Sequence, residues 1–288
     1  MLGGLARRAS IVEKLKSEDM PLLVVDSGNL FTNGWAGANQ KQSAIRARLI
    51  SRAYMRMGAV AINVGALDLL PGLAFLRKEA SRGLPLLSSN LVDPSTKNSI
   101  FKPYVIKKVD SIRVAFFGLL SPNIRTDIYK EAGKQFLVND PVGTAREMVG
   151  RLRGKADVII LLSDLPSDNQ QEVTRAAPGI HFVLGGRDGR YVQSPFWEGQ
   201  TPILESYRYG MYAGKLQLAL INASSPLMYE RTEEQARQQA LSGNDLRTSK
   251  EPPSRGNRFQ WTLIPLDMSM PEDKEVSGWI KKTGIERD

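Results

Sequence analysis

Short apolar runs alternate with amphipathic stretches along the first two thirds of the chain. Residues 5–18 place apolar side chains on one side of a helix and arginines and lysines on the other, so they form an amphipathic helix. The apolar run that follows ends at a turn-forming Asp-Ser-Gly-Asn cluster and indicates a buried strand. By the same criteria we expect helices at 44–57, 70–81, 141–152 and 169–176, and strands at 22–25, 59–62, 84–88, 157–162 and 180–184. Strands that alternate with helices in this way predict an α/β fold with parallel pairing.

A few segments depart from this alternation. Residues 104–109 and 112–118 flank Asp110-Ser111 and predict a β-hairpin. Two later strands, at 202–205 and 216–222, follow each other without a helix, which favours a mixed or two-sheet core.

The polar stretch at 223–258 marks the expected domain organisation. It is rich in Glu and Gln and then in Pro, and we interpret it as a surface helix followed by a flexible linker. Residues 1–222 then form the core of one domain, and 259–288 supply its closing strand (259–266) and last helix (271–282).

Composition excludes several classes of protein. The chain of 288 residues has no cysteine, which rules out disulfides, thiol nucleophiles and cysteine-ligated metals. Its 39 Lys and Arg against 30 Asp and Glu give a net charge of +9, but the excess is spread out and no nucleic-acid motif accompanies it. We therefore expect no specific nucleic-acid partner. No apolar run reaches the roughly 18 residues of a membrane span, and no secretory signal is visible.

Several segments, in order and with matching spacing, resemble the catalytic domain of bacterial 5'-nucleotidases and UDP-sugar hydrolases, which are calcineurin-like metallophosphoesterases. They are GGLARR at 3–8, LVVDSGN at 23–29, KPYVI at 102–106, ADVIILLS at 156–163, PGIHFVLGG at 178–186 and LIPLD at 263–267 followed by PED at 271–273. The resemblance implies a four-layer α/β/β/α sandwich. It also places the family's first "DxHG" strand upstream of Gly3, so we expect the domain to lack that strand here.

That family hydrolyses phosphoesters with two divalent metal ions, which activate water and clamp the reacting oxygens. The resemblance implies that their ligands are lost in this chain, so we expect no intact catalytic residue and no metal cofactor. The replaced positions are Asn29 for an Asp, Val64 and Gly65 for the Asn and His of "GNHEFD", Asp164 for the His of "ALSH", and Arg187 and Gly189 for the two histidines of "GGHSH".

The candidates for a residual polar site are Asp26, Asn29, Asp164, Arg187 and Asp188. Oxygen ligands of this kind suit magnesium or calcium, whereas the simpler interpretation is that they are ordinary polar residues at turns and strand ends. Arg187 argues against a cation, because its guanidinium stays protonated. We therefore expect it to pair with Asp164 or to hold an anion such as phosphate.

Two interpretations of function remain. The first is a catalytically degenerate module with a binding or scaffolding role, and the alternative is an active nucleotide hydrolase of the same family with a rebuilt or upstream-completed site. The resemblance further implies an exported, periplasmic location, and degenerate relatives that occur beside multihaem cytochrome modules make such a cytochrome a candidate partner. The single histidine, His181, fits a structural role inside a strand. The aromatic residues Trp35, Phe196, Trp197, Tyr207, Tyr209 and Tyr212 line a groove or pack loops onto the sheet.

Overall fold

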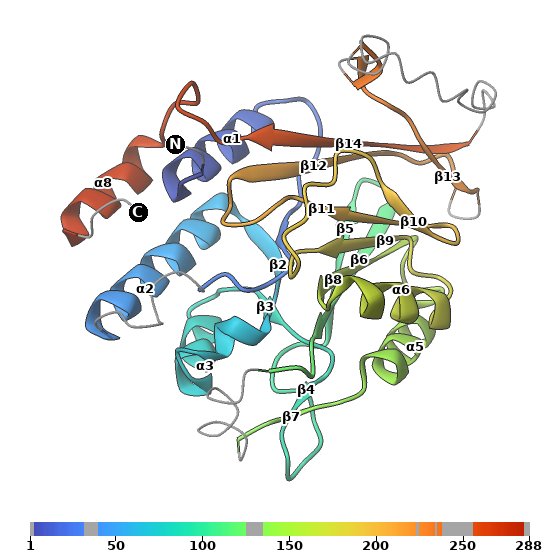
Figure 1. Ribbon diagram of the computed structural model, residues 1–288, viewed down its shortest axis with the longest axis horizontal. Coiled ribbons are helices and arrows are strands. Elements are labelled where there is room, and N and C mark those ends of the chain that lie inside the picture. Colours follow the sequence, from blue (N-terminus) through green and yellow to red (C-terminus); the bar gives the residue numbers. More distant parts are fainter. Residues whose placement is uncertain are drawn as a thin grey trace.

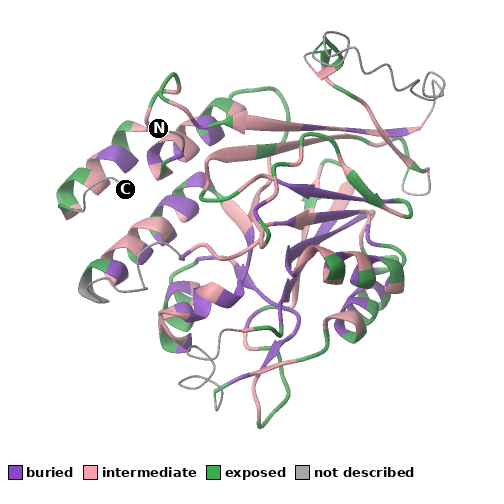
Figure 2. Cartoon of the chain, in the orientation of Figure 1, coloured by how far each residue is buried: buried purple, intermediate pink, exposed green. Residues whose placement is uncertain are grey.

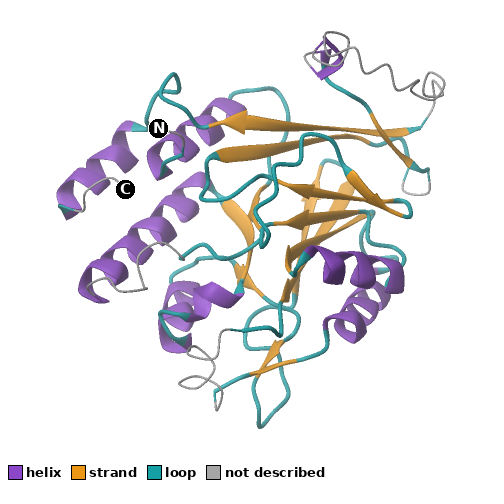
Figure 3. Cartoon of the chain, viewed as in Figure 1, coloured by secondary structure: helices purple, strands orange, loops and turns teal. Residues whose placement is uncertain are grey.

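The computed structural model describes residues 3–31, 40–124, 135–222, 225–233, 235–237 and 256–284. Helices occupy the two outer sides of the molecule, and β-strands fill the space between them (Figures 1 and 3).

The larger sheet has six strands in the order β10-β11-β9-β8-β6-β5. Its central strands β6, β8, β9 and β11 are parallel, while β5 and β10 pair antiparallel at the two edges. The carboxyl ends of the parallel strands therefore meet at one edge of the sheet. The strands are β5 (Tyr104–Val109), β6 (Ile112–Leu120), β8 (Val158–Asp164), β9 (Phe182–Gly185), β10 (Phe196–Glu198) and β11 (Thr201–Glu205).

Two three-stranded sheets form the second β-layer. One is parallel, with the order β1-β2-β3, and the other has the order β12-β14-β13. A separate short pair, β4 with β7, is antiparallel. These strands are β1 (Val24–Asp26), β2 (Ala59–Asn63), β3 (Leu86–Leu87), β4 (Leu91–Val92), β7 (Leu137–Val138), β12 (Tyr212–Ala219), β13 (Leu227–Tyr229) and β14 (Asn257–Pro265).

The helices fall into two groups on opposite sides of the sheets (Figure 1). The first group is α1 (Leu5–Lys16), α2 (Gln40–Met57), the 3₁₀ helix η1 (Ala66–Leu69), α3 (Leu73–Ser81) and α8 (Lys274–Thr283), and the second is α5 (Pro141–Leu152) with α6 (Ser167–Ala176).

Three buried clusters hold these four layers together, and the alternation of strand residues explains them. Successive side chains of a strand point to opposite faces. In β6, Phe116 belongs to the cluster between the β-layers, with Trp261 of β14, while Phe117 belongs to the cluster with Met148 of α5. A third cluster joins the first helix group to the second β-layer, through residues such as Tyr54. The expected four-layer α/β/β/α sandwich is confirmed. Figure 2 shows the buried residues along the central strands.

Most expected elements are present, whereas the short strands β4, β7 and β10 and the 3₁₀ helix η1 were not expected. The hairpin of β5 and β6 is confirmed, whereas β12 begins at Tyr212, four residues earlier than the apolar run suggested. At both ends of 223–258, where we expected a surface helix and a linker, the chain forms strands instead. Residues Leu227–Tyr229 form β13, and Asn257 is buried in β14, where its side chain binds the backbone of Ile221, Asn222 and Ser225.

The strands at the two ends of 223–258 form in polar sequence because pairing between strands uses backbone N–H and C=O groups, which polar residues also have. Positions 234 and 238–255 lie outside the described residues, as does Trp35. The division into core, insert and closing segment, and the expected lack of the family's first strand, stay predictions. Within the described part of the chain, no helix has the length and apolar character needed to cross a bilayer.

Candidate functional site

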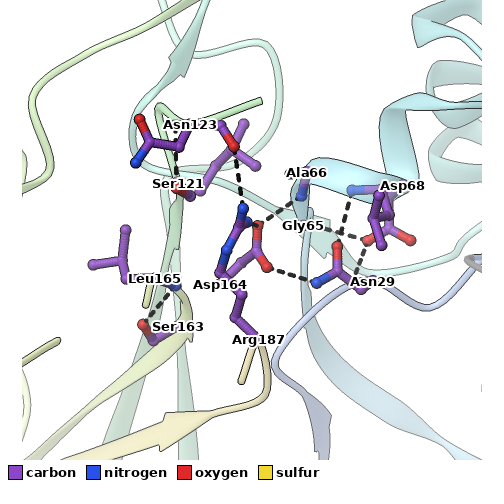
Figure 4. Close-up of polar contacts among 12 residues, drawn as sticks. Asn29, Gly65, Ala66, Asp68, Ser121, Asn123, Ser163, Asp164, Leu165 and Arg187 are labelled. Carbon is purple, nitrogen blue, oxygen red and sulfur yellow. Dashed lines mark hydrogen bonds and ion pairs between the residues drawn. The ribbon is translucent and has the colours of Figure 1, made fainter. Parts of the chain in front are cut away.

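The candidate site lies where strands of both β-layers end (Figure 4). Asp164 is the last residue of β8, and Arg187 follows β9 by two residues. Asn29 comes from the turn after β1, and Gly65 lies just beyond β2. Ligands of open α/β sheets gather at such carboxyl ends, so the fold gives this place the position of an active site.

Asp164 is the centre of the site, and both of its carboxylate oxygens are engaged. Its Oδ1 accepts a hydrogen bond from the side-chain amide of Asn29 at 2.6 Å. Its Oδ2 accepts one from the backbone N–H of Ala66 at 2.7 Å and lies 3.3 Å from Nη1 of Arg187. The side chain has no exposed surface, and this burial raises the pKa of Asp164, against the opposing effects of the Ala66 amide and the Arg187 charge.

Asn29 fills the space in front of Gly65. Its backbone φ of 60° is left-handed, a conformation that asparagine adopts more readily than most residues. Its Oδ1 accepts from the N–H of Leu67 at 2.9 Å while its amide donates to Asp164, so both ends of the side chain are used. A Cβ on Gly65 would come within 2.5 Å of the Asn29 backbone nitrogen and closer still to Oδ1. No side chain at position 65 fits beside Asn29 as it stands.

The other positions replaced in this chain, Val64, Arg187 and Gly189, are also packed against neighbouring residues. Val64 is fully buried in the apolar cluster under the first helix group. Arg187 is 26% exposed, and its Nη2 donates to the carbonyl of Asn123 at 3.1 Å. At Gly189, an added Cβ would meet the Cβ of Arg208 at 2.9 Å, so that position is backed by the neighbouring loop.

Asp68 is a residue that the sequence analysis missed. It is 1% exposed and accepts three backbone hydrogen bonds, from Asn29 (2.8 Å), Phe31 (2.9 Å) and Gly65 (2.9 Å). Burial raises its pKa to about 7, while the amides of Phe31 and Gly65 oppose that shift. Asp68 thus ties the turn after β1 to the turn after β2. The signal was present, since it is the aspartate that ends the segment matched to "GNHEFD".

Asp26 and Asp188 make their contacts elsewhere. Asp26 accepts from the hydroxyl of Tyr54 at 2.6 Å, and that hydroxyl in turn accepts from Arg8, so Asp26 helps to anchor α1 and α2. Asp188 accepts from the backbone (2.8 Å) and the hydroxyl of Ser167 at the start of α6. The structure therefore joins Asn29, Asp164 and Arg187 through direct contacts and gives the other two carboxylates different partners.

His181 lies at the opposite end of β9 from Arg187. Its Nδ1 accepts from the backbone N–H of Ile159 at 3.1 Å, and burial lowers its pKa. These contacts are those of a structural histidine.

Comparison with known proteins finds distant relatives of this chain. No family model matches the chain. It is 24% identical over 206 residues to the 2',3'-cyclic-nucleotide 2'-phosphodiesterase/3'-nucleotidase of Salmonella typhimurium, covering 64% of this chain and 32% of that protein. It is 25% identical over 260 residues to the trifunctional nucleotide phosphoesterase YfkN of Bacillus subtilis, covering 76% of this chain and 18% of that one. The chain thus spans about a third or less of these relatives.

Solved structures agree on the fold. The sulfate thiohydrolase SoxB of Thermus thermophilus superposes with a TM-score of 0.77 at 17% identity, over 98% of this chain and 46% of that one. The calcineurin-like phosphoesterase structure of YfkN gives 0.72 at 21% identity, over 98% and 88%. The chain is a distant relative of the 5'-nucleotidases and cyclic-nucleotide phosphodiesterases. Its fold is that of their calcineurin-like phosphoesterase domain.

The divalent metals of those relatives do not fit the donors found here. Among the described residues, no three His, Cys, Asp or Glu side chains stand close enough to hold a metal ion. A permanent cation lies 3.3 Å from Asp164, and the second carboxylate of the site, Asp68, is bound by three backbone N–H groups. A divalent ion at that point would meet the Arg187 charge in a poorly screened environment. The Asn29 Oδ1, the atom that would bind a metal, already accepts from the N–H of Leu67, and its amide nitrogen donates to Asp164.

Proposed function

We propose that this chain is a catalytically degenerate phosphoesterase module with a binding or scaffolding role. The supporting observation is that the fully buried carboxylate of Asp164 is matched by the Asn29 amide, the Ala66 N–H and the Arg187 guanidinium. These groups satisfy it as hydrogen-bond donors and as charge, which is the work that metal ions do for a carboxylate in the relatives.

Charge balance is the physical core of the proposal. A two-metal centre needs several anionic or neutral ligands around a large positive charge. This network instead contains one carboxylate, one amide and one guanidinium, and is close to neutral without any ion. By the resemblance, Asn29 stands for an aspartate and Asp164 for a histidine, so the network keeps one carboxylate, and the fixed cation of Arg187 balances it.

An exported location and a multihaem cytochrome partner rest on family resemblance, and both belong to this proposal. The nucleotide phosphoesterase activities in the names of the relatives are the competing proposal. It requires water activation at a site whose two described carboxylates, Asp164 and Asp68, are already engaged by donors of the chain.

Nucleotide hydrolysis tests the proposal directly. The purified chain is assayed with Mn²⁺, Zn²⁺ or Mg²⁺ on 2',3'-cyclic AMP, 3'-AMP and 5'-AMP, beside an active nucleotidase. We expect background rates. Metal-dependent turnover that Asp164→Asn abolishes would contradict the proposal, provided that Asp110→Asn, the same change at the exposed hairpin turn, leaves it intact.

A further inference from the structure

An exposed aromatic and basic surface lies beside the site and is not explained by it. We name it the Tyr/Arg face, and it consists of Arg190, Tyr191, Phe196, Tyr207, Arg208 and Tyr209. Three of its rings are unusually exposed, at 45% for Tyr191, 42% for Phe196 and 67% for Tyr209. Large aromatic side chains gathered at the surface of a folded domain mark interaction sites more often than chance.

The contacts of the Tyr/Arg face fall into two groups, Tyr191 with Tyr207, Arg208 and Tyr209, and Arg190 with Phe196, which the neighbouring positions 190 and 191 join along the chain. The Tyr191 and Tyr207 rings meet edge to face at 5.8 Å. The Arg190 guanidinium lies 5.9 Å from the Phe196 ring, and that of Arg208 lies 5.2 Å from Tyr207 and 6.0 Å from Tyr209. Edge strand β10, which carries Phe196, is exposed in Figure 2.

Side chains of the Tyr/Arg face are fixed by contacts with Glu205 and Tyr212. Glu205 has no exposed side-chain surface and binds Arg190 through three contacts: the backbone N–H (3.0 Å), Nε (3.2 Å) and Nη2 (2.9 Å). The Tyr212 ring backs both Tyr191 (5.0 Å) and Tyr207 (5.9 Å). Surface side chains that are ordered before binding lose less entropy when a partner arrives.

Backbone strain in the same loop is an independent observation. Tyr207 has a φ of 69° and Tyr209 a φ of 57°, both in the left-handed region that bulky side chains avoid. Such strain persists only where surrounding contacts enforce it, and it concentrates at functional sites. Arg208 and Tyr209, the two exposed residues of this loop, follow Tyr207 directly.

The composition of the face indicates a protein partner. Tyrosine and arginine are enriched in the energetic centres of protein interfaces, and loops of Tyr, Ser and Gly, such as Ser206-Tyr-Arg-Tyr-Gly210, supply rigid contact area. Arg208 is exposed, and in the part of the chain that the structure describes no carboxylate lies within ion-pair distance of it. Together with the net charge of +9, this favours an acidic segment as occupant.

We infer that the Tyr/Arg face docks an acidic, aromatic-containing protein segment. A second copy of this chain is a poorer occupant, because a symmetric contact would bring two Arg208 side chains and two strongly basic surfaces together. The inference rests on the binding role proposed above and names the surface that performs it. It also predicts communication with the site, since Gly189, two residues from Arg187, packs against Arg208.

The test uses a defined probe, a fluorescent random copolymer of glutamate and tyrosine, in fluorescence anisotropy with EDTA present. The variant is Arg208→Gln with Tyr209→Ser, two exposed positions. The matched control is Lys108→Gln, which removes the same charge from β5 at the opposite edge of the six-stranded sheet. Circular dichroism confirms that each variant is folded.

We expect saturable binding that weakens about tenfold or more in the double variant and stays unchanged in the control. No binding, equal binding by the double variant, or equal loss in the control would overturn the inference. So would a double-stranded DNA or anionic vesicle that binds more tightly and loses binding in the same variant. Because metal and nucleotide are absent, failure here leaves the hydrolysis result untouched.

Discussion

Nη1 of Arg187 lies 3.3 Å from Oδ2 of Asp164, at the point where the parallel strands β8 and β9 end. The pairing expected from the sequence is therefore confirmed. Asp164 is fully buried while Arg187 is one quarter exposed, so the pair lies at the boundary between a buried and a surface ion pair. This partial burial determines how much the ion pair contributes to the stability of the fold.

Removing the Arg187 guanidinium leaves the buried Asp164 carboxylate without its ion-pair partner. Arg187→Gln is expected to lower the free energy of unfolding by about 2–3 kcal/mol, less than the roughly 3–5 kcal/mol of a fully buried pair. Urea denaturation measures it, with Arg208→Gln as the exposed control. In a double-mutant cycle with Asp164→Asn, the two losses should be clearly less than additive. Additive losses would show that the residues do not interact.

Arg187 as an anion site is a distinct hypothesis with a distinct signature. If its free N–H groups hold phosphate, inorganic phosphate raises the thermal midpoint of the wild type and leaves Arg187→Gln unmoved. If the arginine serves Asp164 alone, phosphate moves neither protein. The structural contacts to Asp164 and Asn123 favour the second result.

An aspartate at position 29, the residue that the motif resemblance implies there, should be harmful. In Asn29→Asp, a second carboxylate would stand at the 2.6 Å contact with Asp164, and the donated hydrogen bond would be lost. We expect a loss of about 2–4 kcal/mol at neutral pH, partly recovered on acidification as one carboxyl gains a proton. Thermal melts between pH 4 and 8 measure it. Asn29→Gly, which keeps the left-handed turn, is the control. Unchanged stability of Asn29→Asp would show that a cation already compensates the site.

Position 65 tests how fully Asn29 occupies the site. Gly65→Ala places a Cβ within 2.5 Å of a backbone nitrogen, so the turn must shift, at about 1–3 kcal/mol or more. Gly150→Ala is the matched control, because that helical glycine has nothing within 4 Å of an added Cβ. The control should be neutral or slightly stabilising. Equal stability of the two variants would contradict the described packing.

Asp68 sets a pH dependence with a definite sign. Burial raises its pKa to about 7, above its unfolded value of 3.8. The folded protein therefore binds more protons than the unfolded chain between these values, and this contribution to stability is full below pH 4 and lost as pH rises to about 7. Thermal midpoints from pH 4 to 8 should show a slope that Asp68→Asn reduces. Asp164, whose pKa is raised too, leaves some slope behind. A slope unaffected by Asp68→Asn would contradict this assignment.

The sequence predicted the parts of this molecule whose pattern reflects burial. Apolar runs such as that of β8 are buried on both faces, and the helix at Pro141–Leu152 has the expected bounds, with Asp140 capping its first turn. The short strand β13 was missed because it lies in polar sequence and is fixed by pairing with β14. Pairing with a distant strand leaves little trace in local composition.

The residues of the candidate site were also predicted only in part. Alignment of motifs placed Asp164 and Arg187 together, since strand ends in one sheet converge. It gave no means of separating Asp26 and Asp188, whose partners Tyr54 and Ser167 come from other elements. Asp68 was overlooked although it ends the segment matched to "GNHEFD", because its three contacts to backbone amides depend on how the loops fold.

The central claim is that a network of Asp164, Asn29 and Arg187 has replaced a metal centre. Equilibrium dialysis of the metal-free protein against Mn²⁺ or Zn²⁺, with bound metal measured by mass spectrometry, tests it most directly. The account predicts no stoichiometric metal at micromolar concentrations, in the wild type and in Asp164→Asn alike. Stoichiometric metal in the wild type that Asp164→Asn removes, while Asp110→Asn retains it, would contradict the claim.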